Sequence, residues 1–182
     1  MKRILFLLFP FLFYIISFVR AQDKPRPFEL PDNITIGLGL GLDHGGIGTN
    51  FLVYPEKHFG LFVGGGYALV DFTYNVGMKY RFYSDNAKTI PYIVGMYGYN
   101  AAIYVSNAKS YNRLFFGPTV GFGLDFRTIP THGGYWSVAL LIPIRSAEVQ
   151  DYIDDLKNNH GVEFKNGLYP IAISAGYKFI IE

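Results

Sequence analysis

The sequence predicts an all-β fold: an eight-stranded antiparallel up-and-down transmembrane barrel with one short amphipathic helix in its last long loop. Two observations carry this prediction. Apolar residues alternate with small or polar residues in eight successive stretches, and many of the small residues are glycine. Because successive side chains of a strand point to opposite sides of a sheet, each stretch has one apolar face and one narrow face. An apolar outside and a narrow inside are typical of the wall of a small membrane barrel.

Residues 114–127, with the sequence LFFGPTVGFGLDFR, show the alternation most clearly. The apolar row consists of Leu114, Phe116, Pro118, Val120, Phe122, Leu124 and Phe126. The other row contains three glycines and then Asp125. A strand facing water would carry long polar side chains there, since repeated glycine weakens a strand. The composition agrees: 21 of 182 residues are glycine, above the usual share of about 7%, and 18% are aromatic.

Eight stretches of this kind follow one another, separated by glycine-rich or polar turns. The predicted strands occupy residues 34–43, 47–54, 58–68, 71–83, 89–104, 114–127, 135–145 and 168–181. Their number is even, and most are long enough for the roughly 9 to 11 residues that a tilted membrane strand requires.

Residues 1–21 have the features of a secretory signal peptide, and we expect cleavage after Ala21. An uncleaved membrane anchor is the alternative. However, the apolar run 4–19 is shorter than the roughly 20 residues needed to span a bilayer, and Pro10 interrupts it. The chain has no cysteine, which excludes disulfides, a lipid anchor on cysteine and cysteine-bound metal.

The predicted leader distorts the charge of the whole chain. It holds three of the 16 Lys and Arg residues and none of the 14 Asp and Glu residues, so 13 basic residues face 14 acidic ones after cleavage. A near-neutral exported chain is not expected to bind nucleic acid. Residues 22–32 contain three prolines and predict an exposed N-terminal arm, followed by the barrel domain at 33–182.

One segment departs from the period of two. Residues 146–159 place Val149, Tyr152, Ile153 and Leu156 at helical spacing, with Ser146 as a possible cap and Gly161 after the end. We therefore expect a short helix in the loop 146–167. Its apolar stripe is the predicted interaction face of this loop, and it must rest on some other surface, for which the rim of the barrel is the nearest.

The leader, the eight alternating stretches and the aromatic residues of the last strand together resemble the small eight-stranded outer-membrane barrels of the OmpA and OmpX types, in the form common in Bacteroidota. The resemblance covers residues 33–182. It implies the outer membrane of a Gram-negative bacterium, with both chain ends in the periplasm. The loops at 43–46, 69–70, 105–112 and 146–167 would then face outside.

Four charged residues fall on the inward rows of the fourth, sixth and eighth strands: Lys79, Arg81, Asp125 and Lys178. They could form an ion-conducting constriction. Since eight strands enclose a space that side chains just fill, a charge network that plugs the lumen is the favoured interpretation. Asp125 is then the expected counter-charge for Lys79, Arg81 or Lys178.

The four histidines, His44, His58, His132 and His160, are all predicted in turns or loops. His44 beside Asp43, or His160 near Ser146, could form the base of a lipid-modifying enzyme, but no motif supplies a nucleophile. Their spacing does not suit a metal site, and we expect no cofactor. Aromatic residues near strand ends could bind sugars, although membrane girdles are favoured: Tyr54, Tyr83, Tyr99, Tyr104, Tyr135, Trp136 and Tyr177.

The sequence thus favours a non-enzymatic outer-membrane barrel with a plugged lumen. Its loop 146–167 would contact lipopolysaccharide or a protein partner, and we expect a monomer. The alternatives are a lipid A deacylase or acyltransferase, a channel for small hydrophobic solutes, and a soluble periplasmic barrel. The continuous apolar outward rows speak against the soluble form.

Overall fold

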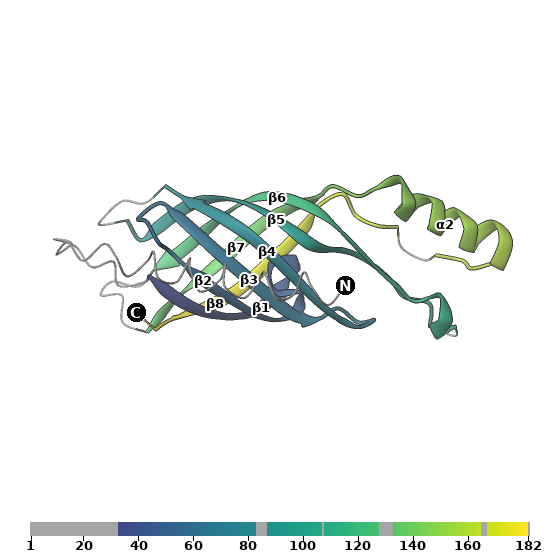
Figure 1. Cartoon of the computed structure of the whole chain (residues 1–182), viewed down its shortest axis with the longest axis horizontal. Helices are drawn as coiled ribbons and strands as arrows, with labels where there is room; N and C mark the ends of the chain where they lie inside the picture. The colour runs from purple at the N-terminus through teal and green to yellow at the C-terminus, as the bar shows by residue number, and fades with distance from the viewer. Residues whose placement is uncertain (1–32, 83–86, 107, 128–132, 165–166, 182) are drawn as a thin grey trace, which may run out of the picture. The chain divides into compact units, whose positions relative to one another are not determined.

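The computed structural model describes residues 33–82, 87–106, 108–127, 133–164 and 167–181. Its eight strands are all antiparallel and form one closed barrel in chain order, in which β8 pairs back with β1 (Figure 1). The predicted eight-stranded antiparallel up-and-down barrel is therefore confirmed. The predicted leader and N-terminal arm lie outside the described residues, as do Tyr83 and His132.

The strands follow the predicted order with small shifts at their ends. They are β1 (Ile34–Gly41), β2 (Gly46–Val53), β3 (Phe59–Tyr67), β4 (Phe72–Arg81), β5 (Thr89–Ile103), β6 (Arg113–Arg127), β7 (Gly134–Pro143) and β8 (Ala172–Ile180). The largest error is at β8, which was predicted from residue 168. Pro170 cannot donate a backbone hydrogen bond to a neighbouring strand, so regular pairing begins only after it.

The alternation along β6 divides the wall as predicted. Phe115, Thr119 and Asp125 are buried, whereas Val120 and Phe122 are exposed. All eight strands repeat this division, and each places large apolar side chains on the outside. Representative pairs are Leu38 and Leu40, Ile47 and Phe51, Leu61 and Val63, Val76 and Met78, Ile93 and Tyr97, Val120 and Phe122, Leu140 and Ile142, and Ile173 and Phe179. We refer to this surface as the apolar belt.

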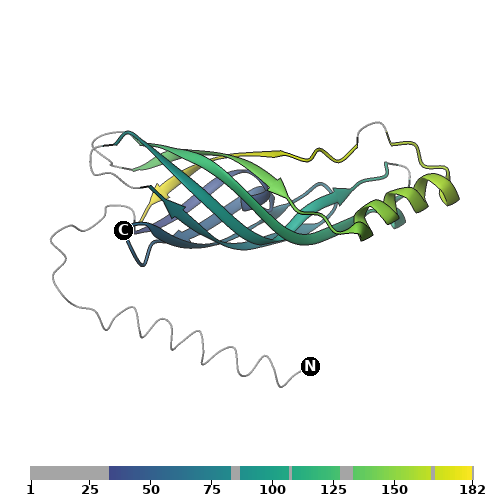
Figure 2. The same ribbon diagram turned by 90° about the horizontal axis from the view of Figure 1, so that it is seen from above.

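The wall is uneven in height. β5 and β6 have 15 residues each, whereas β1 and β2 have eight each. The β5–β6 hairpin therefore extends beyond the other strands at the end of the barrel where α2 lies (Figures 1 and 2). We call this the loop end, and the opposite end, where β1 begins and β8 finishes, the terminal end. At the tip of the hairpin is the short 3-10 turn η2 (Lys109–Tyr111).

The predicted helix is present as α2 (Ala147–His160), one residue away from the expected bounds. Ser146 precedes it in an extended conformation, although its side chain makes no capping hydrogen bond. Gly161 ends it with φ of 62°, a left-handed conformation that glycine adopts readily. In the described parts of the chain, no helix is both long enough and apolar enough to cross a membrane.

Candidate functional site

The barrel interior contains a buried ion pair between β4 and β6. The Lys79 Nζ lies 2.8 Å from each carboxylate oxygen of Asp125, and both residues are almost fully buried. From β5, the ring centroid of Tyr92 lies 3.5 Å from the same Nζ. The Tyr92 hydroxyl is 2.9 Å from the Ser137 Oγ on β7. Four consecutive strands thus contribute to one polar contact across the lumen.

The other two residues of the predicted charge network have different contacts. The Arg81 Nε donates to the backbone oxygen of Lys57 over 2.7 Å, and its guanidinium lies 3.6 Å from the ring centroid of Tyr54. The Lys178 Nζ donates to the Asn50 Oδ1 over 2.5 Å. Of the three candidate cations, it is therefore Lys79 that the structure brings to Asp125.

The connection between β1 and β2 folds into the barrel, where the sequence predicted an outward-facing loop. It forms the 3-10 turn η1 (Leu42–His44), drawn inside the ring of strands in Figure 1. Leu42 and His44 are 8% and 1% exposed. The prediction that residues 43–46 face outside is wrong, because Gly41, with φ of 133°, lets the chain leave the wall two residues earlier than expected and turn inward.

Polar side chains of the barrel wall bind the backbone of this turn. The Asn75 amide donates a hydrogen bond to the Leu42 backbone oxygen, the Asn50 amide donates to the Asp43 backbone oxygen, and the Thr73 hydroxyl donates to the Gly45 backbone oxygen. The donor–acceptor distances are 2.6 to 2.8 Å. All three donors are at most 2% exposed. Since buried carbonyl groups need hydrogen-bond donors, these wall residues allow a backbone turn to occupy the lumen.

The glycines of the inward rows provide the space for η1. A Cβ atom at Gly39 or Gly176 would lie only 2.8 or 2.7 Å from the His44 Nε2, and one at Gly64 would collide with the Asp43 backbone oxygen. The glycine-rich rows predicted a narrow lumen. In the structure, they accommodate a specific segment of the chain inside it.

The first histidine pair that the sequence singled out is formed, but it lacks the arrangement of a catalytic triad. The His44 Nδ1 lies 2.9 Å from the Asp43 Oδ1, and the Ser174 hydroxyl donates to the same carboxylate. A nucleophilic serine would instead hydrogen-bond to the imidazole. Among the described residues, the His44 Nε2 has no hydrogen-bond partner.

The suggestion that His160 lies near Ser146 is wrong. Ser146 precedes the first residue of α2 and His160 is the last, so a helix of 14 residues, about 21 Å long, separates them. The His160 Nδ1 instead lies 3.1 Å from the Tyr111 hydroxyl.

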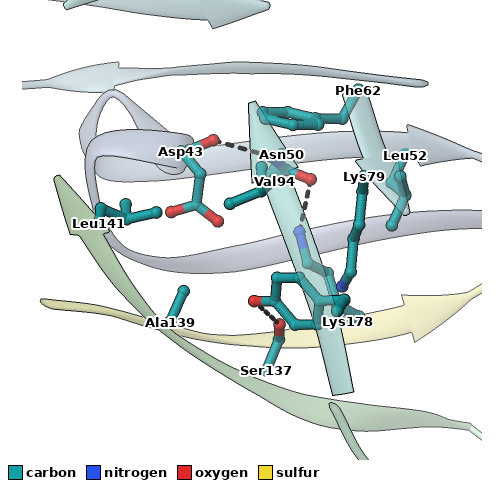
Figure 3. A pocket seen from close by; sticks show the side chains of 11 residues that line it. Asp43, Asn50, Leu52, Phe62, Lys79, Val94, Ser137, Ala139, Leu141 and Lys178 are labelled. Carbon is teal, nitrogen blue, oxygen red and sulfur yellow. Dashed lines mark hydrogen bonds between the residues drawn. The ribbon is translucent and has the colours of Figure 1, made fainter. Parts of the chain in front are cut away.

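The space left between η1 and the ion pair is small. A cavity of about 10 Å³ remains beside Asp43, Asn50, Lys79 and Lys178 (Figure 3). This is about the space that one water molecule needs. Side chains and η1 therefore fill the lumen at this level.

The predicted interaction face of the helix packs against the chain's own hairpin. Together these side chains form an apolar cluster outside the barrel, separate from the buried apolar residues of the lumen, which we call the α2 cluster: Ala101, Ile103, Phe115, Val149 and Leu156. Tyr152 and Ile153 complete the stripe and are half-buried. The Arg113 Nη2 lies 2.5 Å from the Glu148 Oε1 at the margin of this contact. The stripe thus rests on the extended β5–β6 hairpin.

Two of the aromatic residues predicted to form girdles face inward. Tyr54 and Tyr135 are 2% and 1% exposed. Tyr135 and Trp136 are adjacent on β7, so alternation places them on opposite faces and both cannot belong to one surface. Trp136 is 59% exposed and makes an edge contact with Tyr177, while Tyr104 is exposed and Tyr99 is half-buried.

Sequence reasoning missed the polar residues that bind η1. Asn50, Thr73, Asn75 and Ser174 all lie at buried positions of their strands. The usable signal was the type of residue there, because small amides and hydroxyls at inward positions suit partners that are backbone groups.

In the described ranges, no three His, Asp or Glu side chains gather closely enough to hold a metal ion. Comparisons with protein-family models, with curated proteins and with solved structures give no match.

Proposed function

We propose that this protein is a small non-enzymatic outer-membrane barrel of a Gram-negative bacterium, with a filled lumen and a loop end that contacts a partner. The observation that carries the proposal is the apolar belt. Large apolar side chains are exposed on every one of the eight strands, and several of them are more than half exposed. A contiguous apolar surface of this extent is unfavourable in water and is matched by the hydrocarbon of a bilayer.

The interior supports a structural barrel in preference to a solute channel. η1, the Lys79–Asp125 pair and the Lys178–Asn50 contact lie across the lumen, with a cavity for about one water molecule between them. An ion or solute could pass only if several of these contacts separated.

The interior also gives little support to a lipid-modifying enzyme. His44 and Ser174 are at most 2% exposed, so a lipid has no access to them in this arrangement. The Ser174 hydroxyl donates to the Asp43 carboxylate and not to the His44 imidazole, so the described contacts lack the serine–imidazole hydrogen bond that activates a nucleophilic serine.

The polar side of α2 is the favoured contact surface of the loop 146–167, since its apolar side is already covered. The helix carries four acidic residues, Glu148, Asp151, Asp154 and Asp155, against one lysine. An acidic surface repels the phosphates of lipopolysaccharide. Of the two predicted partners, a protein with a basic surface therefore fits better than lipopolysaccharide.

Trp136, the single tryptophan, tests the membrane placement directly. Its side chain lies on the outer face of β7. We expect its fluorescence, after refolding into vesicles, to be quenched more by lipids brominated near the head group than by lipids brominated near the chain end. In the matched variant Trp136→Phe with Leu140→Trp, four residues further along the same face, the deeper bromines should quench more strongly.

Fractionation and conductance complete the test. The protein should be found in the outer membrane and should migrate differently on gels before and after boiling. Planar bilayers should show no stable open channel. Recovery in the soluble fraction with no bromine quenching would exclude the membrane barrel, and a stable conductance would exclude the filled lumen alone.

A further inference from the structure

A second cavity lies at the loop end, outside the barrel. It has a volume of about 210 Å³, against about 10 Å³ for the cavity in the lumen. The pocket is lined by residues of three segments: Ile103 and Tyr104 at the end of β5, Ile153 and Lys157 of α2, and Phe164 and Leu168 of the segment that follows α2. The walls are therefore mainly apolar, and they come from three segments held together by the α2 cluster.

Among the described residues that line this pocket, Lys157 is the one that carries an ammonium group. Lys157 is one helical turn after Ile153, so both side chains lie on the same side of α2. The Lys157 Nζ lies 6.0 Å from the ring centroid of Phe164, which places the charge over the pocket wall. No ion pair with a described carboxylate engages Lys157, whereas Glu148 is bound to Arg113 and Asp155 faces His160.

We propose that this pocket binds a small amphiphilic acid, namely a free medium-chain fatty acid whose carboxylate pairs with Lys157. The apolar walls fit an alkyl chain, and the ammonium selects an anionic head group. A cavity of about 210 Å³ exceeds the roughly 150 Å³ that holds a benzene molecule and is smaller than the roughly 300 Å³ and more of pockets for larger ligands. A chain of about eight carbons is therefore favoured over an intact phospholipid.

This inference does not depend on the proposed membrane function. It rests on a pocket beyond the barrel wall, and the fluorescence of Trp136 reports membrane insertion separately. The binding test uses chain that is inserted in lipid, and Trp136 quenching checks that insertion in the same sample, so failure of the pocket and failure of the membrane placement give different results.

The test is a calorimetric titration in which octanoate is added to the refolded full-length chain in lipid nanodiscs. The same titration of empty nanodiscs measures how much octanoate partitions into the lipid alone. We expect saturable binding at one site per chain. Lys157→Gln should weaken this binding by about tenfold, because it removes a charge-assisted contact and keeps most of the side chain. The matched control Lys109→Gln, an exposed lysine in η2 that does not line the pocket, should change the affinity less than about twofold.

Two further arms separate the charge from the apolar fit. Octanol should bind the original chain more weakly than octanoate, and Lys157→Gln should leave octanol binding unchanged. Lys157→Glu should abolish binding of octanoate and allow octylammonium to bind instead. Since Lys157 is exposed, these variants should retain the gel shift of the folded barrel.

Three results would overturn the proposal. The first is octanoate binding that does not exceed that of empty nanodiscs. The second is equal affinity of the original chain and Lys157→Gln. The third is saturable binding of a lysophospholipid but not of octanoate, which would assign the pocket to a membrane lipid.

Discussion

The molecule has two interiors, and they differ in how far they depend on paired polar groups. The barrel lumen combines buried apolar side chains, among them Leu52, Phe62 and Leu141, with polar contacts: an ion pair, a lysine bound to an asparagine, and a backbone turn held by three wall side chains. The α2 cluster is closed by apolar side chains from one helix and one hairpin. The outward rows of the strands are almost entirely apolar, whereas the inward rows mix apolar residues with small and polar ones, so the lumen contains polar groups that each need a particular partner.

This contrast predicts how each interior responds to substitution. A buried polar group depends on a particular partner, and loss of that partner leaves it without compensation. The contribution of a buried apolar group comes from the volume it fills, so the stability lost when it is removed grows with the size of the cavity left behind. The following substitutions separate these two responses.

The largest effect is expected for Asp125→Ala. It leaves the Lys79 ammonium buried in the lumen without a carboxylate and should lower the free energy of unfolding by about 3–5 kcal/mol. This change is measured by urea titration of the vesicle-inserted protein, with the gel shift as the measure of the folded fraction at each urea concentration.

The matched control replaces both partners, as Lys79→Met with Asp125→Leu. Because it removes the charge together with its partner, it should recover most of the stability lost in the single variant. If Asp125→Ala costs less than about 1 kcal/mol, the pair is solvated and the lumen is not closed as described.

The second effect concerns the apolar interior. Leu156 is 0% exposed in the α2 cluster, and Leu156→Ala should lower the stability of this cluster by about 2–5 kcal/mol because it leaves a cavity. We expect the loss to be local, with faster hydrogen exchange in α2 and an unchanged gel shift of the barrel. Unfolding of the whole barrel by this substitution would show that the two interiors are one cooperative unit.

The two interiors also differ in how well the sequence predicts them. The stripe from Val149 to Leu156 could be recognised because helical spacing fixes which residues share a face. The inward position of Lys79 and Asp125 follows equally from a period of two. Which cation meets Asp125 depends on the shear between strands that are not neighbours, and no local pattern encodes that quantity.

The inward fold of η1 was beyond local sequence reasoning for a related reason. A His-Gly-Gly sequence is compatible with any tight turn, and the choice between solvent and lumen depends on donors from β2 and β4. Those donors lie up to 33 residues away in the chain. The glycines of the inward rows indicated that the lumen has space beside the wall, but they did not indicate that η1 fills it.

A third, smaller effect tests this use of space. Gly64→Ala places a Cβ against the Asp43 backbone oxygen and should cost about 1–3 kcal/mol, because η1 must shift. Gly95→Ala on β5 is the matched control, since nothing lies within 4 Å of its Cβ. That change should stabilise the strand by about 0.5–1 kcal/mol. Equal effects of the two substitutions in urea titrations would mean that η1 does not pack against Gly64.

The smallest effect is expected where the α2 cluster meets solvent, at the ion pair between Arg113 and Glu148. The two side chains are 46% and 61% exposed, so water already solvates both charges and Glu148→Gln should cost less than about 1 kcal/mol. Arg113→Ala should cost more than Glu148→Gln, because the guanidinium also lies 5.0 and 5.1 Å from the rings of Phe115 and Tyr152. A double-mutant cycle read by hydrogen exchange in α2 separates these contributions. A coupling energy above about 2 kcal/mol would mean that this edge is as dependent on paired charges as the lumen, and the contrast between the two interiors would not hold.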